Sequence, residues 1–158
     1  MSDPQPNDAS PGGVQQFLLQ RIYLKDLSFE SPASPHVFAT PWQPQMRLEV
    51  DTRATPLGDA FYEVVLSLTL TAQQDGNTVC LIELQQAGVF LISGIQDSLM
   101  PQVLHVTCPT ILFPYVRETV DHLALKGGLP PFLLAPLDFG ALQRSATASR
   151  PHSDTQAP

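Results

Sequence analysis

The chain has 158 residues, of which 43% are hydrophobic and only 15% are charged, and its formal net charge is −7. This length suits one domain, and the acidic balance argues against nucleic acid as a ligand, because phosphates require a basic surface. Cys80 and Cys108 form no CxxC pair, so we expect buried thiols in a reducing cytoplasm and not a secreted disulfide scaffold.

The two ends of the chain differ from the middle in composition. Residues 1–14 and 145–158 are polar and rich in proline and small residues, which predicts a disordered N-terminal arm and a disordered C-terminal tail around a folded domain at 15–144. The arm has neither the basic nor the apolar segment of a secretory signal, and no apolar run is long enough to span a bilayer. We therefore expect no membrane insertion.

Four strands are predicted first along the chain. Gln16–Phe29 is apolar on both faces at its start, whereas Gln45–Asp51 and Ala60–Gln73 alternate between apolar and polar residues. Asp75-Gly76 is a tight-hairpin signal, and it leads into a long strand at Asn77–Ser93 with a possible bend at Gly88. Strands joined by short hairpins pair antiparallel.

Helices are predicted last. Pro109 suits a first helical position, an amphipathic stripe follows it, and Lys126 with Gly127-Gly128 ends the helix. A weaker helix is predicted at 98–106, and another from the N-cap Asp138 to about residue 146. Strands followed by helices predict an α+β fold, with a four-stranded antiparallel sheet and its helices on one face.

More apolar surface is predicted than these few helices can cover. The strand segments 17–24 and 89–92 are apolar on both sides, and the proline-rich loops 31–45 and 129–136 contain aromatic residues and leucines. We therefore expect the second face to be buried by another subunit or by a ligand. The alternative is that the helices wrap more of the sheet than this count allows.

Catalytic and metal-binding motifs are scarce. His105 and Cys108 form an H-x-x-C with His122 as a possible third ligand, which leaves a small metal-dependent enzyme open as an alternative. The carboxylate pairs Asp26 with Glu30 and Glu63 with Glu83 have no histidine or glycine-rich loop beside them in sequence, so solvated strand charges are the favoured interpretation. We expect no enzyme activity and no cofactor.

Several runs of residues resemble those of one known protein family. They are QRIYLKDLSFE at 20–30, PHVF at 35–38, WQP at 42–44, YEVVL at 62–66, ELQQAG at 83–88, CPTILFPYVRE at 108–118 and LAPLDF at 134–139. Their order and spacing over about residues 15–144 resemble the SecB family of protein-export chaperones. The Gln85-Gln86-Ala87-Gly88 run departs slightly from the family's two consecutive glycines, and the arm is longer here.

The resemblance implies a function as well as a fold. SecB proteins assemble as a dimer of dimers, keep precursor proteins unfolded, and deliver them to the translocase motor SecA without using ATP themselves. By position, the acidic SecA-binding surface would consist of Asp26, Glu30, Leu81 and Glu83. Ile82, Leu84 and Gln86 would lie in the tetramer-forming strand. A SecB-like chaperone for a single client, of the antitoxin type, remains an alternative.

A groove for client polypeptides is expected where the stiff loops meet the edges of the sheet and the long helix. Stiff loops lose little entropy when a client docks, and each buried apolar anchor contributes about 1.5–3 kcal/mol. The candidate groove residues are Phe38, Trp42, Met46, Leu48, Ile111 and Tyr115. The alternative for Phe38 and Trp42 is that they fill the core of the domain.

Overall fold

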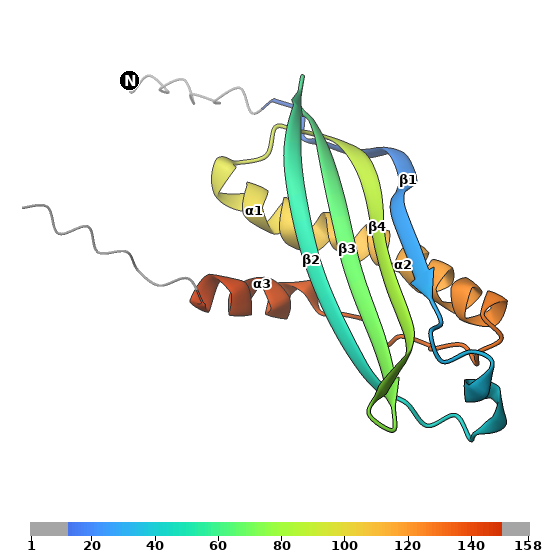
Figure 1. Cartoon of the computed structure of the whole chain (residues 1–158). Coiled ribbons are helices and arrows are strands. Elements are labelled where there is room, and N and C mark those ends of the chain that lie inside the picture. The colour runs from blue at the N-terminus through green and yellow to red at the C-terminus, as the bar shows by residue number, and fades with distance from the viewer. Residues whose placement is uncertain (1–12, 150–158) are drawn as a thin grey trace, which may run out of the picture.

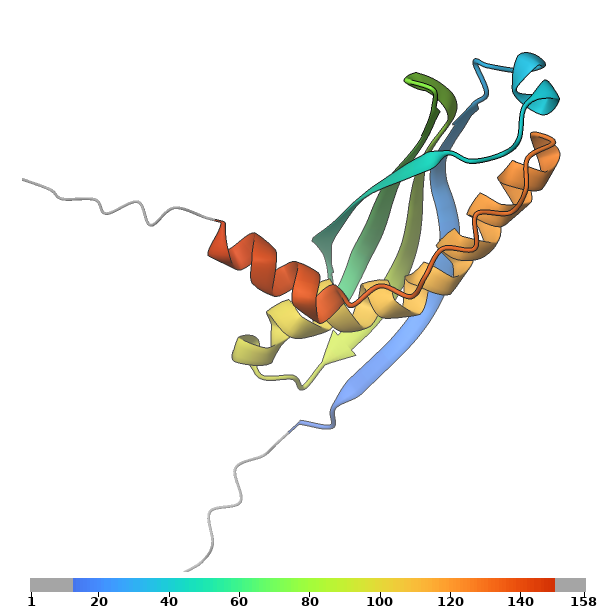
Figure 2. The ribbon, with the colours of Figure 1, turned by 90° about the horizontal axis from the view of Figure 1, so that it is seen from below.

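A computed structural model describes residues 13–149 of the protein. The predicted terminal segments therefore lie largely outside the described residues. The chain forms β1 (Gln16–Glu30), β2 (Gln45–Gly58), β3 (Phe61–Gln74) and β4 (Asn77–Ser93), followed by helices. The α+β fold predicted from the sequence is confirmed, with all the helices on one side of the sheet (Figures 1 and 2).

The four strands form one antiparallel sheet in the order β1-β4-β3-β2. Asp75 and Gly76 connect β3 to β4 with φ angles of 53° and 78°, which is the left-handed backbone that a tight hairpin requires. β2 continues to Gly58, beyond the predicted end at Asp51. Pro56 does not end the strand early because β2 is an edge strand, where a missing N–H costs no ladder hydrogen bond.

β1 contains two register shifts that the sequence pattern did not predict. They fall between Leu19 and Arg21 and between Leu24 and Asp26, so Gln20 and Lys25 have no partner on β4. Each shift reverses the alternation of side chains between the two faces. The prediction of two apolar faces along 17–24 is therefore wrong in detail. Most of the apolar residues of β1 turn to the helix side, namely Phe17, Leu19, Ile22, Leu24, Leu27 and Phe29.

The helical segments after β4 are continuous. The weak helix predicted at 98–106 is observed as 3-10 turn η2 (Asp97–Leu99), one turn of α1 (Met100–Gln102) and π-helix η3 (Val103–Thr107). It leads directly into α2 (Cys108–Lys126), which contains Pro114 and ends at Gly127. Helix α3 (Phe139–Ala148) begins at the predicted cap, where the Asp138 carboxylate accepts a hydrogen bond of 3.0 Å from the Ala141 N–H. It continues to Ala148, four residues into the segment predicted to be a tail.

The core lies between α2 and the inner strands β3 and β4. Its largest fully buried side chains include Phe90, Leu66 and Leu68 from the sheet and Leu112 and Val116 from α2. Gly88 is needed here because a Cβ would lie 2.8 Å from the Phe90 ring and 3.1 Å from the Leu112 Cδ2. Close packing of the helix on the sheet therefore depends on this glycine.

The two proline-rich loops pack against each other and against α2. The 3-10 turn η1 (His36–Ala39) lies in the first loop, and the second loop runs alongside α2 (Figure 2). The rings of Trp42 and Phe132 lie 6.1 Å apart between centroids. The Asp121 carboxylate on α2 accepts a hydrogen bond of 3.0 Å from the Leu133 N–H. None of the helices in residues 13–149 has the length and apolar character needed to cross a bilayer.

Candidate functional site

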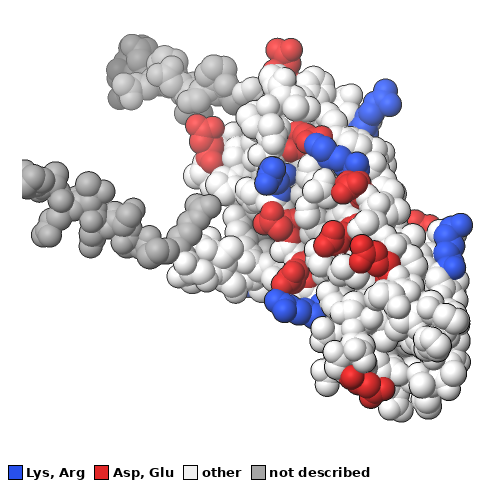
Figure 3. Space-filling model, in the orientation of Figure 1, with Lys and Arg blue, Asp and Glu red and all other residues white. Residues whose placement is uncertain are grey.

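The face of the sheet that turns away from the helices, called the open face below, holds most of the candidate site. Side chains of β4 alternate strictly, so Ile82, Leu84 and Gln86 point toward the helices while Leu81, Glu83 and Gln85 point to the open face. On β1, the shift at Lys25 turns Asp26, Ser28 and Glu30 to the open face. Acidic and basic side chains are interspersed over this face (Figure 3).

Four residues predicted to bind SecA lie together on two neighbouring strands. Glu30 pairs directly with Leu81, Glu83 pairs with Ser28, and Asp26 pairs with Gln85. Within residues 13–149, no lysine or arginine nitrogen comes within 4.0 Å of the three carboxylates. We call Asp26, Glu30, Leu81 and Glu83 the acidic patch. It presents uncompensated negative charge next to one apolar side chain, which suits a basic peptide segment.

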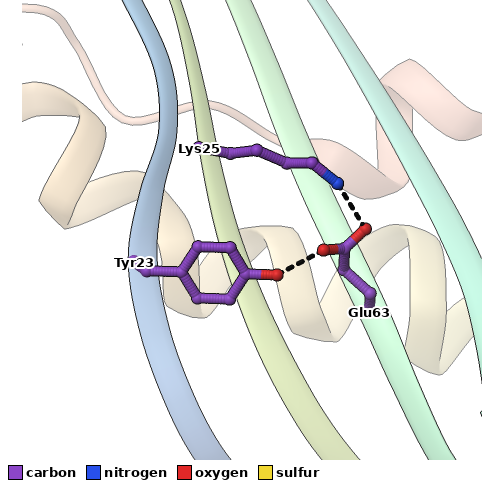
Figure 4. A network of polar contacts seen from close by, with 3 residues as sticks. All are labelled: Tyr23, Lys25 and Glu63. Atoms are coloured by element: carbon purple, nitrogen blue, oxygen red, sulfur yellow. Dashed lines mark hydrogen bonds and ion pairs between the residues drawn. The ribbon is translucent and has the colours of Figure 1, made fainter.

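A polar network lies beside the acidic patch on the same face (Figure 4). Glu63 of β3 accepts hydrogen bonds from the Tyr23 hydroxyl and from the Lys25 ammonium, the latter at 2.8 Å. The hydrogen bond from Lys25, followed by that from Tyr23, lowers the pKa of Glu63 although its partial burial opposes this. Burial, and then the hydrogen bond and charge of Glu63, raise the pKa of Tyr23 to about 12. The network therefore ties β1 to β3 across β4.

The three residues predicted to lie in the tetramer-forming strand are core residues of the single chain. Ile82 is fully buried, Leu84 and Gln86 are 2% and 5% exposed, and all three face the helices. Gln86 donates a hydrogen bond of 2.9 Å from its side-chain amide to the Tyr23 carbonyl, next to the shift at Lys25. Their side chains offer almost no surface to a second copy, so an effect on assembly would act through the position of the strands.

The predicted groove residues fall into two groups. Phe38 and Met46 are 54% and 43% exposed, and Trp42 and Leu48 are partly buried, on the side of the loops and β2. Phe38 lies over Gly128, where a Cβ would meet its ring at 3.2 Å. Trp42 packs on Phe132 and does not fill the centre of the core.

The other two groove candidates, Ile111 and Tyr115, lie on the side of α2 opposite Phe113. Tyr115 is two positions after Phe113, which packs on Phe139 of α3 with ring centroids 5.9 Å apart. Because each helical residue turns about 100°, Phe113 and Tyr115 project from nearly opposite sides. Ile111 shares the side of Tyr115, four positions earlier. The six candidates therefore come from two parts of the chain, the first loop with β2 and the side of α2 opposite Phe113.

The three residues considered for a metal site do not come together. Cys108 and His122 are fourteen positions apart on α2, which corresponds to about 21 Å along the axis. Cys108 is completely buried, and burial raises the pKa of its thiol to about 12, which disfavours the thiolate that zinc requires. His105, three positions before Cys108, lines a cleft together with Asp51 and Gln143. No cluster of three or more potential ligands occurs in the described part of the chain. The described structure therefore does not favour a metal-dependent enzyme built on these three residues.

Sequence reasoning missed the Tyr23–Lys25–Glu63 network and the contact between Trp42 and Phe132. Glu63 was considered only together with Glu83, although it pairs with Val89, six residues along β4 from Glu83. The missing signal was the register shift at Lys25, since only a bulge allows Tyr23, Lys25 and Asp26 to share one face.

Comparisons with known proteins all point to one family. The family model described as preprotein translocase subunit SecB matches residues 11–150. A protein-export protein SecB of Pseudomonas syringae pv. tomato is 46% identical over 141 residues, covering 87% of this chain and 86% of the relative. Another from Marinobacter nauticus is 51% identical over 131 residues, covering 83% of this chain and 79% of the relative.

A solved structure shares the fold at lower identity. It is the SecB-like chaperone Rv1957 of Mycobacterium tuberculosis in complex with a ChAD peptide from the HigA1 antitoxin, with a TM-score of 0.59 and 21% identity over 77% of this chain and 87% of that one. Sequence and fold therefore agree, and this chain belongs to the SecB family of protein-export chaperones.

Proposed function

We propose that this protein binds unfolded precursor polypeptides in the cytoplasm, keeps them competent for translocation and delivers them to SecA. It does so without ATP and without enzymatic activity of its own. The observation that best supports delivery to SecA is the acidic patch. Three carboxylates from two strands converge on the open face, and no basic side chain among the described residues neutralises them.

The proposed contact with SecA is electrostatic. A basic segment of SecA would lie on Asp26, Glu30 and Glu83, with Leu81 supplying an apolar contact beside Glu30. Exposed charge pairs attract their partner over roughly 8–10 Å at physiological salt, and this attraction weakens at higher salt. Binding should therefore be fast, moderate in strength and sensitive to salt, as suits a chaperone that must be released.

The proposed client surface is apolar and lies on the helix side of the molecule. Phe38, Trp42, Met46 and Leu48 border one stretch of it, and Ile111 and Tyr115 border another. The Mycobacterium tuberculosis chaperone of this fold is solved with a peptide, which supports the general capacity of the fold for peptides. Two separate stretches suit an extended client, because several weak contacts add up through effective concentration.

We also propose that the protein assembles as a homotetramer, a dimer of dimers. Both edges of the sheet are unpaired in the single chain, and β1 exposes apolar side chains along its length, such as Phe17, Leu18 and Leu24. An exposed edge strand with apolar side chains favours pairing with another copy. Native mass spectrometry of the purified protein should give four times the mass of the chain.

The central test distinguishes the binding of SecA from the binding of client polypeptides. Replacing Asp26, Glu30 and Glu83 together with lysine should abolish SecA binding, measured by titration calorimetry. The same variant should still suppress the refolding of a chemically denatured, reduced precursor. A control with lysine at Asp59, Asp97 and Glu118, which are exposed and lie outside the acidic patch, makes the same change in charge.

The outcome is decisive for each half of the proposal. Wild-type affinity for SecA in the acidic-patch variant would rule out the assignment of that surface. Failure of the wild-type protein to delay refolding, together with a monomeric mass, would rule out the chaperone function itself. The control variant should match wild type in both assays.

A further inference from the structure

Lys25 is a basic residue that lies next to the acidic patch on the open face. Lys25 directly precedes Asp26, and it is the residue without a partner at the register shift, so its side chain shares the open face with Asp26. A lysine beside Asp26 and within one strand of Glu83 would neutralise part of the acidic patch. In the structure it does not, because its ammonium lies 2.8 Å from Glu63 Oε1 on β3.

The geometry points to Glu63 as a positioning residue that keeps the acidic patch negatively charged by holding Lys25 away from Asp26 and Glu83. This inference rests on the proposed function, since it concerns the recognition of the same basic partner segment. Glu63 itself lies too far away to contact that segment. It pairs with Val89, and six residues of β4 at about 3.3 Å each place Glu83 about 20 Å from it.

Three features fit Glu63 for this role. Its side chain is only 19% exposed, compared with 44% for Lys25, so water competes less for the carboxylate. The Tyr23 hydroxyl donates to the second carboxylate oxygen, which fixes the orientation of the first toward Lys25 (Figure 4). Tyr23 pairs with Ala87 on β4, whose small side chain leaves room for the ring to reach across to β3.

A second ion pair on the same face provides a matched control. Arg47 and Glu49 lie on β2 with their nitrogen and oxygen 2.6 Å apart, and both are well exposed. Glu49 is in register with Thr69, which is in register with Glu83, so two strand spacings of about 4.8 Å separate Glu49 from the acidic patch. Its charge is therefore closer to Glu83 than that of Glu63. If simple loss of negative charge were responsible, Glu49→Gln would weaken binding more than Glu63→Gln.

The experiment compares four variants for binding to purified SecA at low and at high salt. Glu63→Gln releases Lys25 and should weaken binding by about three- to tenfold at low salt, with a smaller effect at high salt. Adding Lys25→Met to it should restore affinity to within about twofold of wild type, because the released cation is gone. Lys25→Met alone should bind at least as tightly as wild type, and Glu49→Gln should change binding by less than about twofold.

The possible failures can be told apart. If Glu63→Gln binds like wild type while lysine substitutions in the acidic patch abolish binding, the positioning role is excluded and the proposed function survives. If the double variant binds as weakly as Glu63→Gln, the role of Glu63 is purely structural and the inference is also excluded. If lysine substitutions in the acidic patch leave SecA binding unchanged, the proposed SecA-binding surface is excluded. The inference about Glu63 is then excluded with it. A cooperative urea transition within about 1 kcal/mol of wild type, together with unchanged client binding, would show that Glu63→Gln is folded.

Discussion

The two faces of the sheet are built from the same four strands but differ in composition and in the property that each supports. The helix face is a continuous apolar layer, and almost every side chain of β3 and β4 on it is buried. The open face mixes charge pairs, uncompensated carboxylates and a few apolar residues such as Val89 and Leu91. Stability therefore depends on one face, whereas the proposed recognition of SecA depends on the other. Side chains one residue apart in sequence contribute to different properties.

The largest contrast is expected between neighbouring residues of β4. Phe90 is completely buried against α2, so Phe90→Ala should lower the free energy of unfolding by about 3–5 kcal/mol. Leu91 faces the opposite way and is only partly buried, so Leu91→Ala should cost about 1 kcal/mol or less. Urea unfolding of both variants measures the difference. Equal losses would mean that the open face is packed like a core, for example by another subunit.

Gln86 tests how the register shift at Lys25 is maintained. Gln86→Leu removes the amide that donates to the Tyr23 carbonyl and leaves a buried acceptor unpaired, which should cost about 1–3 kcal/mol. Amide hydrogen exchange should increase at Leu24 to Asp26. The control Gln85→Leu, on the open face of the same strand, should change the free energy of unfolding by less than about 0.5 kcal/mol. Unchanged exchange in Gln86→Leu would show that the shift is fixed by other contacts.

Leu27 and Ser28 compare the two faces on β1 after the shift. Leu27→Lys places a cation on the helix side and should lower the free energy of unfolding by about 1–2 kcal/mol. Ser28→Lys lies directly opposite Glu83, so it should leave the free energy of unfolding within about 0.5 kcal/mol of wild type and weaken SecA binding. If the two substitutions had the reverse effects, the shift at Lys25 would be absent in solution.

The smallest effect concerns the pH dependence of the Tyr23–Glu63 contact. Because the pKa of Glu63 is lowered on folding, its stabilisation, less than about 1 kcal/mol, is present above about pH 4.3 and is lost as pH falls through the lowered value. The pKa of Tyr23 is raised to about 12, so its contribution is present below about pH 10 and is lost as pH rises through 12.

Two measurements test these signs. The difference in unfolding free energy between wild type and Glu63→Gln should disappear on acidification. In that variant the tyrosinate absorbance of Tyr23 should emerge at lower pH than in wild type, because a hydrogen bond and a negative charge that hinder ionisation are removed. A tyrosinate titration identical to that of wild type would contradict the contact.

The sequence alone determined the element types, the hairpin at Asp75-Gly76, the cap at Asp138 and the family. These features are encoded locally, in alternation, turn residues and runs of family-like sequence within short segments. Only the tertiary structure decided which face each residue of β1 occupies. A strand has a side-chain period of two, so the unpaired residues Gln20 and Lys25 each reverse the pattern, and no local signal marked them. Pairing with β4 fixes those positions, and with them the acidic patch and the contact between Lys25 and Glu63.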